Sequence, residues 1–158
     1  MANKRQMTFS QRLMQARRSF MFRIFRLLLR AGVTIGRMSL LTVRGRKSGQ
    51  PRTTPVLIAE YNGHRFLVST YGETNWVRNL RAAGEAILTR GRRSERISVI
   101  EVGAKEAAPV LRHFVSTVPV VVRPYFDVTP TSPLTTFEQE VARHPVFRVT
   151  SASANFFS

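Results

Sequence analysis

The sequence predicts an α+β fold, with one strand-rich domain preceded by a basic amphipathic helix. At 158 residues, of which 43% are hydrophobic, the chain is long enough for one core and short for two. From residue 40 onward, short apolar runs of alternating polarity recur between turn-forming residues, which is the pattern of β-strands. No internal repeat or linker divides the chain. We therefore expect an N-terminal helix within residues 1–32, the domain at 33–150 and a tail at 151–158.

Residues 8–31 have the pattern of an amphipathic helix, whose start Thr8 or Ser10 can cap. Its arginine face comprises Arg12, Arg23, Arg26 and Arg30, and its apolar face comprises Met14, Met21, Phe25 and Leu28. Two of these arginines, at positions 23 and 26, interrupt the apolar run, so the helix is unsuited to spanning a membrane. Two interpretations stay open: the helix lies on an anionic membrane surface, or its apolar face packs on the domain or on a second subunit.

A cationic turn at residues 45–55 joins two apolar runs, 40–43 and 56–59, which are expected to be strands. Its eleven residues include three cations, three hydroxyls and two glycines. Short polar side chains and free backbone N–H groups in such a turn form a concave site for an anion. Arg46 and Arg52 could add forked contacts to phosphate or carboxylate oxygens. The alternative is a solvated basic hairpin loop.

The remaining elements follow from alternation, helical periodicity and the placement of turn residues. We expect strands at 55–60 and 65–70 joined by an Asn-Gly turn, a short helix at 75–83, strands at 86–90 and 97–102, a helix at 105–118, an irregular proline-containing segment at 120–133, a helix at 135–143 and a closing strand at 146–149.

The charge is strongly positive and unevenly distributed. The net charge is +16, and the 13 cations before the first acidic residue, Glu60, are accompanied by no anion. Such a field attracts polyanions: nucleic acid, an anionic membrane or an acidic cofactor tail. Nucleic acid is disfavoured, because single-strand readers interleave basic and aromatic residues on a sheet. Here four of the 15 aromatic residues lie in the amphipathic helix, away from the predicted strands.

Several other chemistries have no support in the sequence. The chain has no cysteine, which excludes disulfides, thiolate metal sites and cysteine nucleophiles. His64, His113 and His144 are too scattered to suggest a metal site. No nucleophile elbow, P-loop or dinucleotide-binding motif occurs, and nothing points to secretion. We expect a cytoplasmic protein, with peripheral attachment to the inner face of the cell membrane as the open alternative.

Two motifs in this order resemble the deazaflavin (F420)-dependent nitroreductase family. They are the segment GRKSGQPRTTP at 45–55 and a later W-x-x-N-L-R-A segment at 76–82, and the resemblance covers roughly residues 38–102. It implies a split β-barrel, of the FMN-binding split-barrel-like kind, with flanking helices. It also implies an oxidoreductase that binds coenzyme F420, an 8-hydroxy-5-deazaflavin with a phosphodiester and an oligoglutamate tail. Such an enzyme passes a hydride to a quinone, a nitroaromatic or another electron-poor small molecule.

The resemblance also implies a coenzyme-binding set spread over four segments. Arg46, Lys47 and Ser48 match the phosphate and tail contacts; Arg52, Thr53, Thr54, Pro55, Val56 and Leu57 match the strand under the coenzyme; Val68, Ser69, Thr70 and Tyr71 match the end of the next strand; Asn75, Trp76, Val77, Arg78 and Asn79 match the start of the short helix. Tyr71 and Tyr125 are the candidates for protonating or orienting a substrate. Related proteins have a longer, lysine-containing loop before the tryptophan, where this chain has the short segment 72–75 with an acid.

Three rival interpretations remain at this stage. A split barrel that binds flavin mononucleotide (FMN) would use similar anion contacts. A non-catalytic module for a membrane surface or for nucleic acid would use the positive charge and leave both motifs unexplained. The small-molecule electron acceptor is not identified by the sequence, and a homodimer is among the arrangements left open.

Overall fold

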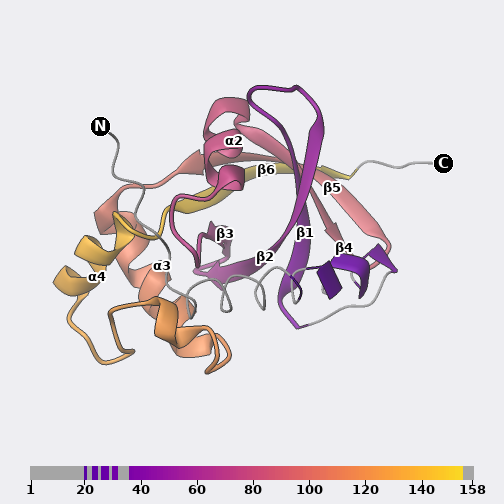
Figure 1. The fold of residues 1–158 in the computed structure, drawn as a ribbon. Helices are drawn as coiled ribbons and strands as arrows, with labels where there is room; N and C mark the ends of the chain where they lie inside the picture. The colour runs from indigo at the N-terminus through magenta and orange to yellow at the C-terminus, as the bar shows by residue number, and fades with distance from the viewer. Residues whose placement is uncertain (1–19, 21–22, 25, 29, 32–35, 155–158) are drawn as a thin grey trace, which may run out of the picture.

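The computed structural model describes residues 20, 23, 24, 26–28, 30, 31 and 36–154 of the chain. Its centre is a closed antiparallel barrel with the strand order β1-β2-β3-β6-β5-β4 (Figure 1). The strands are β1 Met38–Arg44, β2 Pro51–Tyr61, β3 His64–Val68, β4 Glu85–Arg90, β5 Arg93–Glu101 and β6 Val146–Ala154, and the helices are α2 Asn75–Ala83, α3 Ala104–Thr117, the 3₁₀ turn η1 Arg123–Tyr125 and α4 Leu134–Val141. The predicted α+β barrel with flanking helices is confirmed.

The barrel interior is one hydrophobic core, and α2 packs against it. Alternate residues of the strands point inward, as the period of a β-strand requires. The interior comprises Leu41, Val43, Val56, Ile58, Leu67, Ala86, Leu88, Ile97 and Phe147. Val77 and Leu80 of α2 join this core with no exposed surface. Gly84, in the left-handed conformation at φ +67°, ends the helix by donating its N–H to Leu80 O at 2.8 Å. The start of α2 is thereby held in a fixed position on the barrel.

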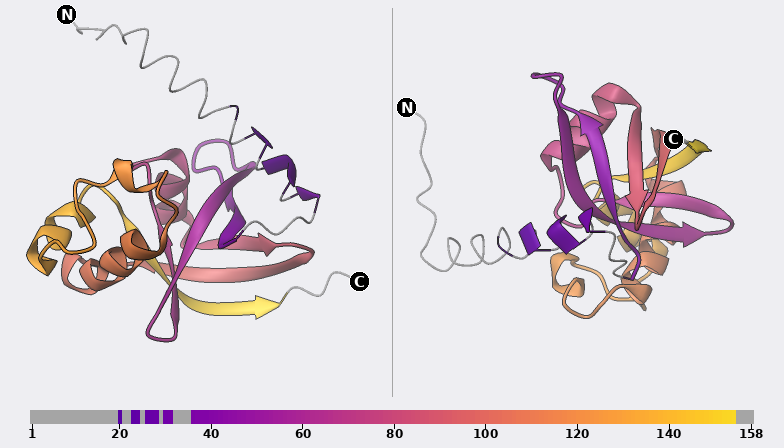
Figure 2. Two further views of the ribbon diagram at one scale, coloured as in Figure 1. Left: turned by 90° about the horizontal axis from the view of Figure 1, so that it is seen from below. Right: turned by 90° about the vertical axis from the view of Figure 1, so that its right-hand side faces the viewer.

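A second core lies outside the barrel, where α3 packs on strands β2 and β3 and α4 packs on α3 (Figures 1 and 2). Phe114 of α3 and Phe137 of α4 are almost completely buried, and they share this core with Ala59 and Phe66 of the strands. Burial of an aromatic side chain of this size stabilises the fold by roughly 1.5–3 kcal/mol. The helical layer therefore attaches firmly to one side of the barrel.

Most predicted elements are confirmed, and the differences occur where the local pattern is weak. The short helix has the predicted bounds, and Asn62 and Gly63 form the predicted turn with φ of +49° and +75°. Residues 69 and 70 lie beyond the end of β3 instead of in a strand. Residues 151–154, expected to belong to a tail, extend β6 to Ala154, which pairs with Glu95. Small alternating Ser and Ala residues give no apolar signal, so the partner strand decides their conformation.

The predicted N-terminal helix is described only in part. Residues 20, 23, 24, 26–28 and 30 are helical, whereas residues 8–19, 21, 22, 25 and 29, which include Met21 and Phe25 of the predicted apolar face, lie outside the described part of the chain. Four apolar side chains of this segment are exposed: Phe20 (67%), Leu27 (65%), Ile24 (42%) and Leu28 (39%). They belong to neither core. Within the described ranges, no helix combines the length and the apolar character needed to cross a membrane.

Candidate functional site

A cleft of about 980 Å³ opens beside the turn between β1 and β2. Its walls come from the N-terminal helix, the end of β1, the first half of β2, the segment after β3 and the start of α2. The lining residues are Arg23, Arg26, Val43, Gly45, Arg46, Lys47, Ser48, Arg52, Thr53, Thr54, Pro55, Tyr71, Thr74, Asn75, Trp76 and Asn79. The volume lies at the upper end of the range of small-molecule and cofactor sites.

The β1–β2 turn folds back on itself through backbone hydrogen bonds. Gly45 N–H donates to Gln50 O at 2.8 Å, and Gly49 N–H donates to Gly45 O at 2.9 Å. Gly49 has φ of +68°, and a Cβ added at Gly45 would lie 2.8 Å from Ser48 Oγ, so both positions favour glycine. Lys47 and Ser48 occupy the tip of the turn. Their backbone N–H groups have no hydrogen-bond partner among the described residues, which leaves two donors for an anion.

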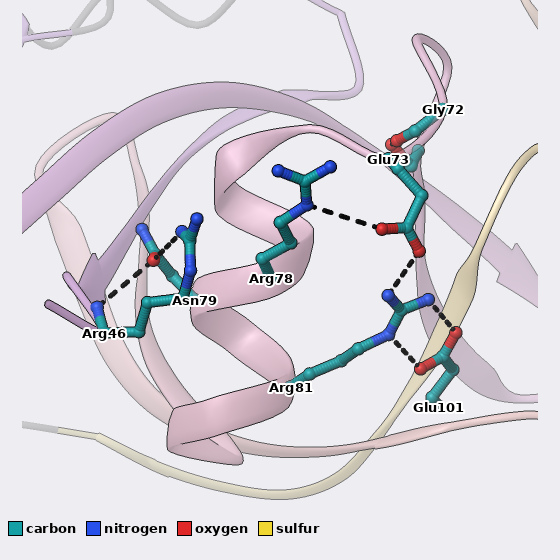
Figure 3. Close-up of polar contacts among 8 residues, drawn as sticks. Arg46, Gly72, Glu73, Arg78, Asn79, Arg81 and Glu101 are labelled. Atoms are coloured by element: carbon teal, nitrogen blue, oxygen red, sulfur yellow. Dashed lines mark hydrogen bonds and ion pairs between the residues drawn. The ribbon is translucent and has the colours of Figure 1, made fainter.

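A buried asparagine connects this turn to α2. Asn79 is 5% exposed, and its Oδ1 accepts two hydrogen bonds from Arg46, one from the backbone N–H at 3.2 Å and one from Nη1 at 2.8 Å (Figure 3). These bonds hold the Arg46 guanidinium against α2. Arg46 belongs to the first sequence motif and Asn79 to the second, and the two residues are 33 positions apart in the chain. The two motifs therefore meet at the cleft.

The cleft is strongly cationic. Five basic residues line it, and no acidic residue does so in the described part of the chain. The acid nearest in sequence to the α2 start, Glu73, binds Arg81 and lies 3.5 Å from Arg78 Nε, with Arg81 also held by Glu101 (Figure 3). The hydrogen bond from Arg81 lowers the pKa of Glu73 below its usual 4.5. Among the described residues, Lys47 and Arg52 have no ion pair, so their charges are available to a bound anion.

A tightly held turn places Tyr71 in the cleft. Ser69 N–H donates to Pro145 O at 3.0 Å, Ser69 Oγ donates to Gly72 O at 2.5 Å, and the buried His144 Nδ1 lies 2.9 Å from Ser69 O. The Tyr71 ring meets the Tyr125 ring edge to face, with centroids 4.7 Å apart. Tyr125 is 42% exposed and does not line the cleft. The two catalytic candidates are thus in contact, and only Tyr71 faces the site.

The structure brings together eleven of the residues expected to bind the coenzyme. These are Arg46, Lys47, Ser48, Arg52, Thr53, Thr54, Pro55, Tyr71, Asn75, Trp76 and Asn79. Seven others lie away from the cleft wall: Val56, Leu57, Val68, Ser69, Thr70, Val77 and Arg78. The three valines belong to the two cores, and Leu57 packs on the core outside the barrel. Ser69 and Thr70 are buried in the turn after β3, and Arg78 faces Glu73. A direct role for these seven stays a prediction.

Five lining residues were not expected from the sequence: Arg23, Arg26, Val43, Gly45 and Thr74. The helix periodicity identified Arg23 and Arg26 as one face of a helix, and nothing in it tells what that face meets. Thr74 Oγ1 is buried and has no hydrogen-bond partner within the described ranges. Since a buried hydroxyl usually has a partner, Thr74 is a further candidate to contact a ligand. The described residues contain no group of three metal-ligating side chains.

The chain is similar to known proteins in sequence and in fold. The model of the F420H(2)-dependent quinone reductase family matches residues 21–129. No curated protein sequence matches this chain. Among solved structures, one described as a domain-swapped dimer is 20% identical, with a TM-score of 0.52 over 80% of this chain and 93% of its own. A protein of unknown function from Agrobacterium tumefaciens str. C58 is 16% identical, with a TM-score of 0.52 over 84% of this chain and 56% of its own. An F420-H2 dependent reductase (FDR-A) is 23% identical, with a TM-score of 0.48 over 72% of this chain and 93% of its own. The first two likenesses support the barrel fold.

Proposed function

The chain belongs to the F420H(2)-dependent quinone reductase family, and we propose that the cationic cleft beside the β1–β2 turn is its coenzyme site. The family match confirms the predicted oxidoreductase and the predicted coenzyme, F420. One observation carries the assignment of the site. The cleft gathers five basic residues and no acidic ones from the described part of the chain, and it includes residues of both sequence motifs.

The donors in the cleft suit the phosphodiester of the coenzyme. The ammonium of Lys47 and the guanidinium of Arg52 form no ion pair within the described ranges, and the backbone N–H groups of Lys47 and Ser48 have no hydrogen-bond partner there. Arg46 is oriented by Asn79 before any ligand binds. Preorganised donors lose little entropy when an anion arrives, so the turn suits tight binding. Thr74 also lines the cleft, and its buried Oγ1 has no hydrogen-bond partner among the described residues.

The cleft also has apolar surface that suits a flat ring. Pro55 and Trp76 are half-buried and line the cleft, and Trp76 packs against Phe147 with ring centroids 6.0 Å apart. When bound in its reduced form, F420 supplies a hydride to an electron-poor acceptor. In this proposal the chain holds the coenzyme and orients its ring toward the acceptor. Reduction of a quinone to a hydroquinone consumes one hydride and one proton, and we assign delivery or orientation of that proton to Tyr71, with Tyr125 supporting its ring.

The experiment that tests the function measures oxidation of reduced F420 by a menadione-like quinone in a stopped-flow instrument. We expect the protein to accelerate the reaction above its rate in free solution, with a dependence on quinone concentration. A titration with F420 and FMN side by side should show tighter binding of F420. No acceleration with any quinone, nitroaromatic or other electron-poor acceptor would contradict the role of the cleft in catalysis.

We also propose that the exposed apolar side chains of the N-terminal segment attach the protein peripherally to an anionic membrane. The support is that Phe20, Ile24, Leu27 and Leu28 are exposed on a segment of a strongly basic chain. Apolar side chains insert below the headgroups while cations are attracted to anionic lipid. Such attachment, from the cytoplasmic side, would bring the cleft near lipid-soluble quinones. The alternative is that a second copy of the chain packs against these apolar side chains. Vesicle co-sedimentation and sedimentation velocity distinguish the membrane from a second copy.

A further inference from the structure

Two arginines of the N-terminal helix line the same cleft as the cationic turn. Arg23 and Arg26 are exposed, are helical, and join Lys47 and Arg52 among the lining residues. Residues three apart in a helix lie on the same face, so both arginines can line the cleft at once. The indigo helical segment runs beside the barrel in both views of Figure 2. The helix thus contributes charge to a site that the sequence motifs place on the barrel alone.

The charge in the cleft exceeds what one phosphodiester neutralises. That group carries one negative charge, whereas five basic residues line the cleft without an acidic neighbour in the described part of the chain. Like charges gathered in one cleft repel each other, and an anion that binds several of them relieves the repulsion. The surplus therefore favours a ligand with further negative charges along an extended arm. Carboxylates of the oligoglutamate tail have this chemistry.

We propose that Arg23 and Arg26 bind the tail carboxylates of the coenzyme, so that the N-terminal helix is part of the binding site and selects for tail charge. The proposal rests on the proposed function of the cleft and adds a tail-recognising subsite to it. A planar guanidinium can bind a carboxylate through two parallel hydrogen bonds. Affinity should accordingly rise with the number of glutamates, and this rise should depend on Arg23 and Arg26.

An anionic lipid headgroup is the other ligand that these arginines could meet. The structure favours the coenzyme tail, because Arg23 and Arg26 line the cleft and the exposed apolar side chains of the same segment do not. The helix can then use its two faces for two partners: the arginine face for the coenzyme and the apolar face for the membrane.

The test compares the full-length protein with the double variant Arg23→Gln/Arg26→Gln. Calorimetric titration would measure binding of three ligands: the tail-free deazaflavin without phosphate, F420 with one glutamate, and F420 with several glutamates. We expect the double variant to bind the long-tailed coenzyme about tenfold more weakly and the tail-free ligand with less than twofold change. Arg30→Gln is the matched control, because Arg30 is exposed on the same helix and does not line the cleft.

Three outcomes would overturn the proposal. Equal weakening for all three ligands would mean that the arginines support the site without touching the tail. Unchanged coenzyme affinity with lost binding to anionic vesicles would make them lipid ligands. Unchanged affinity while Lys47→Ala still weakens binding would refute the tail subsite and leave the proposed function intact. By contrast, if the unaltered protein bound no form of F420, the proposed function would fail together with the subsite.

Discussion

At the scale of single residues, the structure separates cations that are engaged from cations that are available. Arg81 and Arg78 are occupied by Glu73 and Glu101, and Arg46 is held by Asn79. Lys47 and Arg52 have no ion pair among the described residues. This distinction is decided by which acids lie nearby in space. It identifies Lys47 in the β1–β2 turn and Arg52 in the first residues of β2 as the positions whose replacement should act on binding more than on folding.

We predict that Lys47→Ala or Arg52→Ala weakens F420 binding by about 1.5–3 kcal/mol, the scale of a charge-assisted hydrogen bond. Both side chains are exposed, so the melting temperature should stay close to that of the unaltered protein. Binding titrations measure the effect. Arg44→Ala is the control, since Arg44 is also exposed near the turn but does not line the cleft. If the double variant Lys47→Ala/Arg52→Ala bound as tightly as the unaltered protein, the anion site would lie elsewhere.

At the scale of elements, the site depends on how the β1–β2 turn and α2 are joined. Gly84 ends α2, the barrel core fixes its apolar face, and Asn79 then presents Oδ1 to the turn. Residues His144 and Pro145 hold the turn that bears Tyr71 through hydrogen bonds with Ser69. The cleft is therefore shaped by contacts between elements, and variants at these contacts should disturb it indirectly.

We predict that Asn79→Ala lowers the free energy of unfolding by about 1–3 kcal/mol, because it leaves Arg46 without its buried acceptor. Coenzyme binding should also weaken, since Arg46 and the turn lose their orientation. Urea denaturation and titration would measure the two effects. Asn75→Ala is the control for stability, because the Asn75 side chain is exposed and forms no hydrogen bond among the described residues. Unchanged stability in Asn79→Ala would show that the turn holds its shape without α2.

A pH prediction concerns the ion pairs that connect α2 to its surroundings. Arg81 lowers the pKa of Glu73, so this carboxylate contributes stability that is present above its ordinary value of 4.5. That contribution is lost as the pH falls through the lowered pKa of the folded state. We expect Glu73→Gln to be slightly less stable than the unaltered protein at neutral pH, with the difference shrinking in acid. Melting curves from pH about 7 to about 3 measure this. An equal difference in melting temperature at neutral and acid pH would contradict this prediction. Glu60→Gln is the control, because Glu60 is exposed and forms no ion pair in the described part of the chain.

At the scale of the whole molecule, charge and apolar surface are distributed over different faces. Two cores bury the apolar faces of α2, α3 and α4. The described part of the N-terminal helix keeps its apolar side chains exposed while its arginines reach the cleft. A helix arranged in this way can connect coenzyme binding to a membrane, and its apolar face is the part that can be altered without touching the cleft.

We predict that Ile24→Glu/Leu28→Glu abolishes co-sedimentation with anionic vesicles while retaining F420 binding, because neither position is three or four residues from Arg23 or Arg26 in the helix. Each apolar side chain contributes about 1.5–3 kcal/mol when buried, and the added acids are repelled by anionic lipid. The melting temperature should change little, because both side chains are exposed, Ile24 by 42% and Leu28 by 39%. Ile100→Glu, at an exposed position on β5, is the control. Sedimentation velocity would show whether a second copy covers these side chains instead. That would be the result if the unaltered protein did not bind vesicles and formed a dimer, while the double variant was a monomer.

The sequence by itself determined the α+β class, the positions of most strands and the bounds of α2. These follow from local pattern: apolar alternation, the Asn-Gly turn, and a glycine that ends a helix. The two motifs also carried enough information to identify the family and eleven of the residues that line the cleft. Motifs preserve residue types at fixed spacing, and that spacing is visible without coordinates.

Only the tertiary structure decided which of these residues share a surface. The alternation of β2 sends Val56 into the barrel core, barrel closure recruits residues 151–154 into β6, and the hydrogen bond between Arg46 and Asn79 spans two elements. Periodicity assigned Arg23 and Arg26 to one helical face but could not tell that this face meets the cleft. Such contacts join positions far apart in the chain, so they depend on how the strands close into a barrel and not on the local order of residues.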